Sequence, residues 1–402
     1  MNRFESLENC SFSDSHDHAN KNMKQNSNSC EVISKLLLPQ DLMFHIFTLV
    51  PPHYLFNSAR YVCKPWDAAI ASSRFAELCE RFHVRSKPGL YIENRNSHTS
   101  SYFLEFKDDV NGQFERTDLG TPQKMGYLIG TCDGILLISS MARHIVVVNP
   151  ILKCWLKIPR FPISQHHIVV GCQCTITRVP RTAKFKLFFA HVLEVSGVSW
   201  YVFYVLRIGI DNSWKEIDRK EAPLHWCFSG KPLYSGGNDL YWITNNEVIV
   251  MDVDREIVVR EYPLPPRMML GSSPFEILLW MGGRLSCIAY NYSYSKYQIY
   301  ILDFDSRKWS LYHEMGPFDY MAACGHNLNT AAVFRLWINN QIIFRVQLLP
   351  QNQNQIGNGL IYMHFSYNVE TKQLTKIEDI EVGDFAVWLH TNSLASLPTT
   401  LA

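Results

Sequence analysis

Residues 301–312 read ILDFDSRKWSLY: a short apolar run, a polar turn, and a tryptophan that opens another run. The same pattern recurs at 147–158 (VVNPILKCWLKI), 250–262 (VMDVDREIVVREY) and 365–377 (FSYNVETKQLTKI). Short apolar runs bounded by turn residues are typical of β-strands. Their recurrence indicates a repeat architecture built from one strand–turn–strand unit.

The apolar residue that opens the second strand of each copy serves as an anchor for measuring the repeat. Two looser copies, 105–119 and 206–218, bring the number of copies to six. Anchor intervals run from 41 residues (Phe114 to Trp155) to 65 residues (Trp309 to Leu374). A four-stranded propeller blade takes about 40–50 residues, and the longer intervals leave room for inserted loops. The anchors are Phe114, Trp155, Trp214, Val258, Trp309 and Leu374.

These intervals predict an all-β propeller of six or seven blades over residues 88–398. We expect the C-terminal stretch 385–397 (FAVWLHTNSLASL) to supply a strand that closes the ring against the first blade, because an open ring leaves unpaired edges. The polar stretch 351–359 (QNQNQIGNG) is predicted to be a loop between strands. The strongest strand signals are GYLIG (126–130), GILLI (134–138), HIVVVNP (144–150), YVFYVLRI (201–208), DLYWI (239–243), VIVMDV (248–253), IYILDF (299–304) and IIFRVQLL (342–349).

A separate helical block is predicted over residues 36–83, which makes the chain an α+β multidomain protein. Pro39 and Asp41 suit the first turn of a helix that Pro51 and Pro52 bring to an end. A second helix is expected at about 54–64, and Pro65 is expected to open a third. Residues 1–31 are rich in Asn, Ser, His and Lys, and we predict that they form a disordered tail.

The first of these helices is apolar on two faces. A block of about 45 residues is near the lower limit for folding alone and cannot cover both faces. Either the second face packs on the propeller, or it meets another protein in a helix–groove interface. One face holds Leu42, Ile46, Leu49 and Val50; the other holds Met43, Phe44 and Phe47.

Composition excludes several classes of function. The 402-residue chain has a formal net charge of +1, which disfavours general nucleic-acid binding and a basic membrane anchor. No stretch is long and apolar enough to predict a membrane span, and the N-terminus lacks the apolar core of a secretory signal. Eleven scattered cysteines are expected to be reduced and mostly buried. We therefore expect a protein of the nucleus, the cytoplasm or both.

No constellation of catalytic or metal-binding residues stands out. The sequence lacks G-x-S-x-G, H-E-x-x-H, phosphate-loop and C-x-x-C motifs. The best metal candidates are His166, His167, Cys172 and Cys174, but on a strand the cysteines and histidines would not converge on one tetrahedral site. We predict a non-catalytic protein without metal or cofactor. A propeller enzyme with a helical appendage is the less favoured alternative.

The helical block resembles an F-box, a motif that docks on a Skp-type adaptor. The match extends over about a dozen positions in the family's order, with Pro65 as a departure where the family carries another residue. The resemblance assigns adaptor binding to Leu38, Pro39, Leu42, Ile46, Phe47, Val50, Pro51, Leu55, Val62, Cys63 and Trp66. For Val62, Cys63 and Trp66, packing within the block is the competing interpretation.

The later region resembles the F-box-associated, kelch-like domains of plant F-box proteins. The matching stretches are 126–136 (GYLIGTCDGIL), 148–150 (VNP) and 392–394 (NSL), in the family's order. The resemblance implies a substrate receptor of a Skp–cullin–F-box ubiquitin ligase, whose propeller holds an unknown target protein. Ligase-independent action as a scaffold or transcriptional cofactor remains open.

Aromatic residues in predicted turns are the candidates for target contact, because receptors of this kind usually bind through loops on one rim. For each of them, packing between blades is the competing interpretation. These candidates are Trp226, Tyr292, Tyr294, Phe318 and Tyr320.

Overall fold

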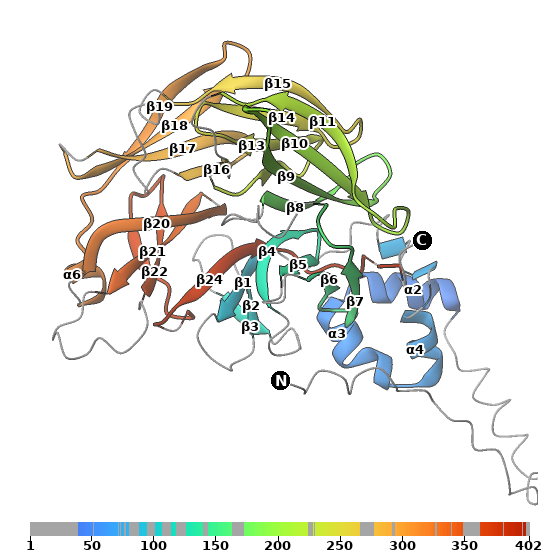
Figure 1. The fold of residues 1–402 in the computed structure, drawn as a ribbon. Helices are drawn as coiled ribbons and strands as arrows, with labels where there is room; N and C mark the ends of the chain where they lie inside the picture. Colours follow the sequence, from blue (N-terminus) through green and yellow to red (C-terminus); the bar gives the residue numbers. More distant parts are fainter. Residues whose placement is uncertain are drawn as a thin grey trace, which may run out of the picture.

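The computed structural model holds a six-bladed β-propeller with a group of short helices at one end (Figure 1). Each blade is a four-stranded antiparallel sheet. The residues that the structure describes are 39–50, 52–70, 72, 74–75, 78–79, 88–94, 101–106, 114–117, 126–139, 144–162, 173–223, 228, 230–265, 277–291, 294–325, 328–338, 340–348, 362–380, 382–395 and 397–398.

Blades 2 to 6 are each built from four strands consecutive in the chain, and the first strand of each lies nearest the centre of the ring. In order they are β4 (Tyr127–Cys132), β5 (Ile135–Ser139), β6 (Ile145–Asn149) and β7 (Cys154–Ile158); β8 (Gln173–Arg178), β9 (Phe185–Val195), β10 (Val198–Arg207) and β11 (Lys215–Glu221); β12 (Leu233–Tyr234), β13 (Asp239–Ile243), β14 (Glu247–Asp252) and β15 (Ile257–Pro263); β16 (Ile277–Met281), β17 (Arg284–Asn291), β18 (Lys296–Asp303) and β19 (Lys308–Met315); and β20 (Leu328–Ile338), β21 (Gln341–Leu348), β22 (Tyr362–Asn368) and β23 (Leu374–Lys376).

Blade 1 joins the two ends of the propeller. Its outer strands are β1 (Gly89–Asn94), β2 (Tyr102–Phe106) and β3 (Phe114–Thr117), and its innermost strand is β24 (Phe385–His390). The pairing of β24 with β1 runs from Gly89 opposite His390 to Asn94 opposite Phe385. The predicted closure by the C-terminal stretch is therefore confirmed, and the number of blades is six.

The six sequence anchors mark the outermost strand of every blade. Five of them lie within β3, β7, β15, β19 and β23, and Trp214 directly precedes β11. Two of the tryptophans tie their blade to the preceding one. The indole Nε1 of Trp214 donates to the carbonyl of Pro159 at 3.0 Å, and that of Trp309 donates to the carbonyl of Pro263 at 2.8 Å. The anchor position thus serves contacts between blades as well as strand formation.

A segment that follows β24, residues 392–395, is fixed to blade 2 and is called the closing segment. Asn149 Nδ2 donates to the carbonyls of Ser393 and Ala395 at 3.1 and 2.8 Å, and Ser393 Oγ donates to the carbonyl of Asp133 at 2.5 Å. Gly134 has a φ of 83°, and a Cβ there would lie 2.2 Å from Ser393 Oγ. The three kelch-like sequence stretches therefore meet at one place.

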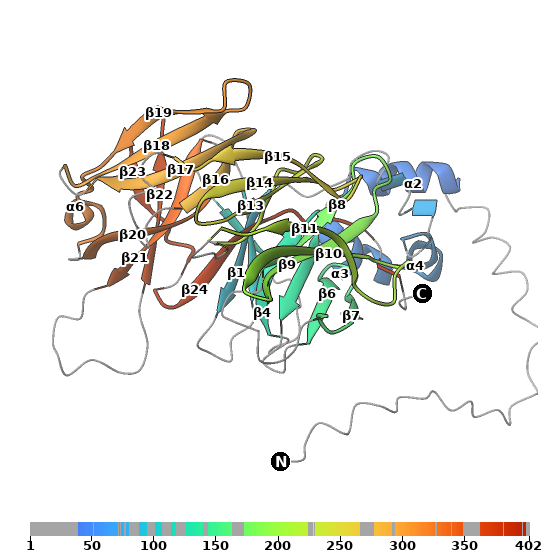
Figure 2. The same ribbon diagram turned by 45° about the horizontal axis from the view of Figure 1, so that its top comes forward.

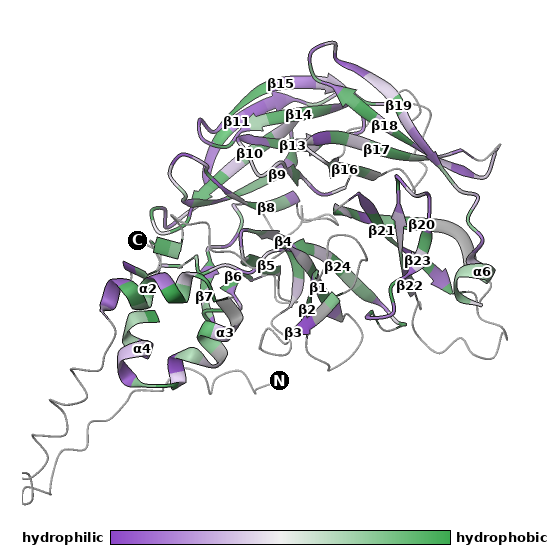
Figure 3. Ribbon diagram, turned by 180° about the vertical axis from the view of Figure 1, so that it is seen from behind, coloured by the Kyte–Doolittle hydropathy of each residue, from purple (hydrophilic) through white to green (hydrophobic). Residues whose placement is uncertain are grey.

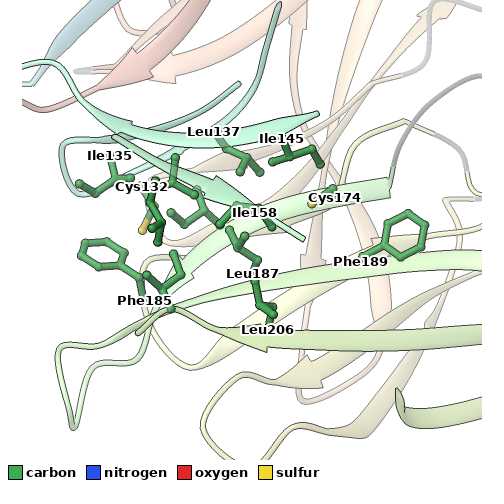
Figure 4. Close-up of a cluster of buried hydrophobic side chains, with 14 of the residues drawn as sticks. Cys132, Ile135, Leu137, Ile145, Ile158, Cys174, Phe185, Leu187, Phe189 and Leu206 are labelled. Atoms are coloured by element: carbon green, nitrogen blue, oxygen red, sulfur yellow. The ribbon is translucent and has the colours of Figure 1, made fainter. Parts of the chain in front are cut away.

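Apolar side chains fill the spaces between neighbouring blades. Figure 4 shows the cluster between blades 2 and 3, in which Leu137 and Ile145 of one blade approach Leu187 and Leu206 of the next. Contacts like these remove most of the apolar surface of each sheet from water, the main favourable term in folding.

Buried charges reinforce the junction between blades 3 and 4. Glu256, in the turn after β14, lies 2.8 Å from Lys186 Nζ and 2.6 Å from Arg207 Nη2. Burial alone would raise the pKa of Glu256, but the hydrogen bonds from Arg207 and Lys186 outweigh it and lower that pKa. The carboxylate is thus held ionised between two cations from the neighbouring blade.

The helical block contains α2 (Gln40–Thr48), α3 (Pro52–Asn57), the 3-10 helix η1 (Ala59–Tyr61) and α4 (Lys64–Ile70). The second helix differs from the prediction, because it starts at Pro52 and gives way to η1 instead of continuing to residue 64. Pro65 is the second residue of α4, within the first turn, where a missing N–H breaks no helical hydrogen bond. Figure 2 shows these helices beside β6 and β7. Among the described residues, no helix is long and apolar enough to span a membrane.

Candidate interaction surfaces

The inner face of the helical block packs on the propeller. Met43, Phe44 and Phe47 are buried, and the ring of Phe47 meets that of Trp66 edge-on at 5.0 Å. The same buried cluster contains side chains of blades 1 and 2 and of the closing segment: Tyr91, Phe103, Leu128, Leu136, Ile138, Val148, Ile151 and Leu394. Of the two alternatives for this face, packing on the propeller is the one observed.

The outer face of the block is apolar and exposed. Leu42, Ile46 and Leu49 lie on one side of α2, at positions i, i+4 and i+7, with 44%, 38% and 73% of their surface exposed. Two exposed residues at the end of η1, Tyr61 and Val62, add to the apolar surface of the block. We call these five residues the helical apolar surface. Figure 3 shows the hydrophobic residues of α2 to α4 in green.

The residues that the F-box resemblance assigns to adaptor binding differ in their exposure. Pro39, Leu42, Ile46 and Val62 are exposed, and Val50, Cys63 and Trp66 are half-buried. Phe47 and Leu55 are buried in the core of the block, so their observed role is packing. Leu38 and Pro51 lie outside the described residues. Tyr61 was missed, because the sequence predicted a continuous second helix instead of η1.

The aromatic residues proposed for target contact are also divided by the structure. Tyr294 is exposed in the turn between β17 and β18. Phe318 stacks on Phe344 at 5.4 Å, and Tyr320 is buried at the start of α6 (Tyr320–Cys324), a helix that the sequence analysis did not predict. Burial raises the pKa of Tyr320. Tyr320 therefore packs into blade 6, whereas Phe318 is only half-buried. Trp226 and Tyr292 lie outside the described residues.

A pocket of about 890 Å³ lies at the rim between blades 5 and 6, and we call it the rim groove. It is bordered by β19, by the connection through α6, and by the turn between β22 and β23. His313 Nε2 lies 3.1 Å from Tyr367 Oη at its wall. Burial and the nearby charge of Lys372 lower the pKa of His313. The lining residues are Lys296, Leu311, Tyr312, His313, Glu314, Gly316, Pro317, Phe318, Asp319, Ala322, Ala323, Tyr367, Lys372 and Leu374.

A contact between opposite blades crosses the centre of the ring. Lys231, just before β12 of blade 4, places its ammonium 3.6 Å from the ring centroid of Trp388 on β24 of blade 1. The neighbouring carbonyl of Gly230 accepts a hydrogen bond from Gln173 of blade 3 at 2.7 Å. The segment before β12 is thus held against the inner strands of two other blades.

The metal candidates of the sequence do not converge within the part of the chain that the structure describes. Cys174 is buried in the cluster between blades 2 and 3, whereas His166, His167 and Cys172 lie outside the described residues. Among the described residues, no group of three or more His, Cys, Asp or Glu side chains is arranged to hold a metal ion.

No family model matches the sequence, so the F-box and kelch-like resemblances remain predictions. No curated protein matches it either. Among solved structures, TolB from Acinetobacter baumannii matches with a TM-score of 0.41 and 9% identity over 75% of this chain and 66% of that one. The propeller domain of the Trilobed protease from Pyrococcus furiosus matches with a TM-score of 0.34 and 15% identity, over 63% of this chain and 72% of that one. The WD40 domain of SCAP from fission yeast matches with a TM-score of 0.32 and 9% identity, over 77% of this chain and 82% of that one.

Proposed function

We propose that this chain is a substrate-recognition subunit of a Skp–cullin–F-box ubiquitin ligase. In this proposal the helical block docks on a Skp-type adaptor, and through it on a cullin, while the propeller holds the protein to be ubiquitinated. The chain carries out no bond chemistry itself. It raises the effective concentration of a target lysine near the ubiquitin-charged enzyme, as tethering does, in the nucleus, the cytoplasm or both.

The observation that carries the proposal is the helical apolar surface. The inner face of α2 is already occupied by the propeller, so packing among the residues that the structure describes does not account for Leu42, Ile46 and Leu49. Burying one leucine or isoleucine side chain contributes about 1.5–3 kcal/mol. A row of such side chains along one helix suits a partner with an apolar groove.

The arrangement of the two candidate surfaces also supports a bridging role. The helices α2 to α4 lie beside blades 1 and 2, whereas α6 lies at the far side of the ring in both views (Figures 1 and 2). Two residues of α6, Ala322 and Ala323, line the rim groove. A target held at the far rim would leave the helical apolar surface open to an adaptor. The two partners would then be joined through a rigid closed ring.

Binding to a purified Skp-type adaptor tests the proposal. We expect the double variant Leu42→Glu, Ile46→Glu to bind the adaptor at least tenfold more weakly than the unmodified chain, because both substitutions place a charge in the contact. Val195→Glu is the matched control, since Val195 is 44% exposed on blade 3, like Leu42 on α2. Equal binding by the double variant and the control, with both folded by circular dichroism, would disprove adaptor docking.

A second measurement separates ligase function from ligase-independent scaffolding. Deleting residues 36–83 is unsuitable, because it would expose the propeller side chains that share the core of the helical block. The double variant on α2 leaves that core intact. We expect target proteins captured with the proteasome blocked to have longer half-lives in cells that carry the double variant. Unchanged half-lives despite lost adaptor binding would favour a scaffold or transcriptional cofactor.

A further inference from the structure

We propose that the rim groove binds an extended acidic peptide segment of a partner protein, paired along the free edge of β19. The proposal deepens the proposed function, because such a segment would belong to the ubiquitination target. Peptide binding can nevertheless be measured without any adaptor.

The position of the groove along a strand edge is the first support. Four consecutive residues of β19, from Leu311 to Glu314, line the groove. Successive side chains of a strand point to opposite faces, so a pocket that touches four in a row must run along the strand's edge. β19 is the last strand of its sheet, and its outer edge has no neighbouring strand in the described sheet. Such an edge is open to an added strand.

A bulge in β19 prepares this edge for contact. The register of β18 and β19 shifts between Ile299 and Tyr300, which pair with His313 and Leu311 and leave Tyr312 without a partner residue in β18. As a result Leu311 and Tyr312 are both about half exposed, at 51% and 52%, although neighbours in a regular strand alternate. Bulges of this kind redirect side chains and are frequent at functional sites. Here the bulge leaves the side chains of Leu311 and Tyr312 available for apolar contacts beside the exposed edge.

One cation at the wall of the groove, Lys372, suits a ligand that carries a carboxylate. The two acids are already engaged: Glu314 Oε1 accepts from Gln298 Nε2 at 2.5 Å, and Asp319 Oδ1 accepts from the Ala322 amide at 2.9 Å, capping α6. Lys296 reaches Glu314 only at 3.9 Å. Lys372 makes no hydrogen bond or ion pair with any residue that the structure describes. The cation that remains available is therefore Lys372.

A peptide fits these observations better than a nucleic acid does. A nucleic acid needs a basic surface that neutralises many phosphates, and the groove holds as many carboxylates (Glu314, Asp319) as lysines. A peptide needs only one carboxylate beside Lys372, and it can set apolar side chains against Leu311 and Tyr312. The backbone groups of the same peptide would pair with β19.

Selection from a phage-displayed library of random ten-residue peptides on the purified full-length chain tests the proposal. We expect the selected peptides to be enriched in Asp and Glu over the starting library. The best peptide, fluorescein-labelled, should bind at least tenfold more weakly when its acidic residues are replaced by Asn or Gln. Selection of no peptide, or of peptides without this enrichment, would overturn the proposal.

Binding measurements on variants of the chain test whether the peptide binds in the rim groove. Lys372→Glu should weaken binding of the selected peptide at least tenfold, and Lys372→Gln should weaken it less. Lys215→Glu makes the same change of charge at an exposed position of β11, on another blade, and should leave binding unchanged. If the peptide binds the Lys372 variants as well as the unmodified chain, the groove is not its site.

N-methylation of the selected peptide tests strand pairing without altering the protein. In strand addition alternate backbone amides donate to the edge, so methylating one alternate set should weaken binding strongly and methylating the other set should not. Equal effects of both sets would rule out pairing with β19. Adaptor binding by the Lys372 variants should remain normal, so failure of the peptide proposal is distinguishable from failure of the ligase proposal.

Discussion

The side-chain amide of Asn149 donates to the backbone carbonyl of Ala395 at 2.8 Å, joining blade 2 to the closing segment across 246 positions of the sequence. The same amide also donates to the carbonyl of Ser393 at 3.1 Å, while Oδ1 accepts from the nearby amides of Ile151 and Leu152 at 2.9 and 3.1 Å. One fully buried side chain therefore shapes the turn before β7 and fixes the segment that follows the last strand.

Replacing Asn149 by alanine is expected to destabilise the protein. The substitution leaves buried carbonyls and amides without partners, which costs about 1–3 kcal/mol for each group left unsatisfied. Asn149→Asp should also destabilise, because it places an acceptor opposite two carbonyls. Urea unfolding measures the loss. Asn212→Ala, at an exposed turn position, is the control and should have little effect.

Gly134→Ala is expected to loosen the closing segment as well. The new methyl group would lie 2.2 Å from Ser393 Oγ at a backbone φ of 83°, so strain and a clash act together. Gly197→Ala separates the two effects, because Gly197 has a φ of 79° and no atom within 4 Å of the added Cβ. Gly197→Ala should cost about 1–2 kcal/mol from strain alone. Equal losses of unfolding free energy for both variants would show that the contact with Ser393 is unimportant.

Substitution of the tryptophan anchors by phenylalanine is expected to lower stability by different amounts at different anchors. Trp214→Phe and Trp309→Phe each remove an indole donor from a carbonyl of the preceding blade and should lower the unfolding free energy by about 0.5–1.5 kcal/mol. Trp155, the anchor of blade 2, is exposed, so Trp155→Phe should change stability much less. Thermal unfolding compares the three variants. A loss at Trp155 as large as at the other two would contradict the assigned role of the indole donors.

Stability is expected to fall in mild acid because of two buried histidines. Burial lowers the pKa of His364 to about 3, with the charges of Arg345 and Arg335 adding to the effect, and burial lowers the pKa of His390 to about 4. Both stay neutral in the folded state while the unfolded chain takes up protons below pH 6.5. The unfolding free energy should therefore be highest above pH 6.5 and fall by about 1.4 kcal/mol per pH unit for each histidine below it.

Urea unfolding at pH 7, 6 and 5 tests this dependence. Glu256, whose pKa is lowered, contributes in the same direction but only below its ordinary pKa of 4.5, outside this range. His390→Gln should reduce the slope by about 1.4 kcal/mol per pH unit, whatever its effect on stability at pH 7. The same slope in this variant and in the unmodified chain would contradict the assignment to His390.

Much of the propeller could be predicted from the sequence, because each repeat shows a local pattern of apolar runs separated by polar turns. The anchors from Phe114 to Leu374 predicted the place of the outermost strands but left six or seven blades open, and the apolar stretch at 385–390 correctly predicted ring closure. Alternation within each strand depends on neighbours two residues apart. Such information survives in a single sequence.

The candidate surfaces were harder to predict, because they depend on which elements meet. The pattern showed two apolar faces on α2 but not that Phe47 faces the propeller, nor that Leu55 lies in the same core. The rim groove combines Lys296, Tyr312 and Lys372, which are distant in sequence and share no motif. Phe318 lies in a connection between elements, as predicted, but Tyr320 begins α6, a five-residue helix that is too short to give a periodic signal.

The shared core of the helical block and the closing segment has a consequence for synthesis of the chain on the ribosome. Phe44 and Phe47 emerge early, but Leu394 of the same cluster is translated only after all six blades. The first helices must therefore wait for the end of the propeller before their packing is complete, although N-terminal units commonly fold first. A nascent chain that stalls before β24 would lack Trp388 and Leu394 of this cluster, so its helices would not yet have the complete support on which the docking face rests.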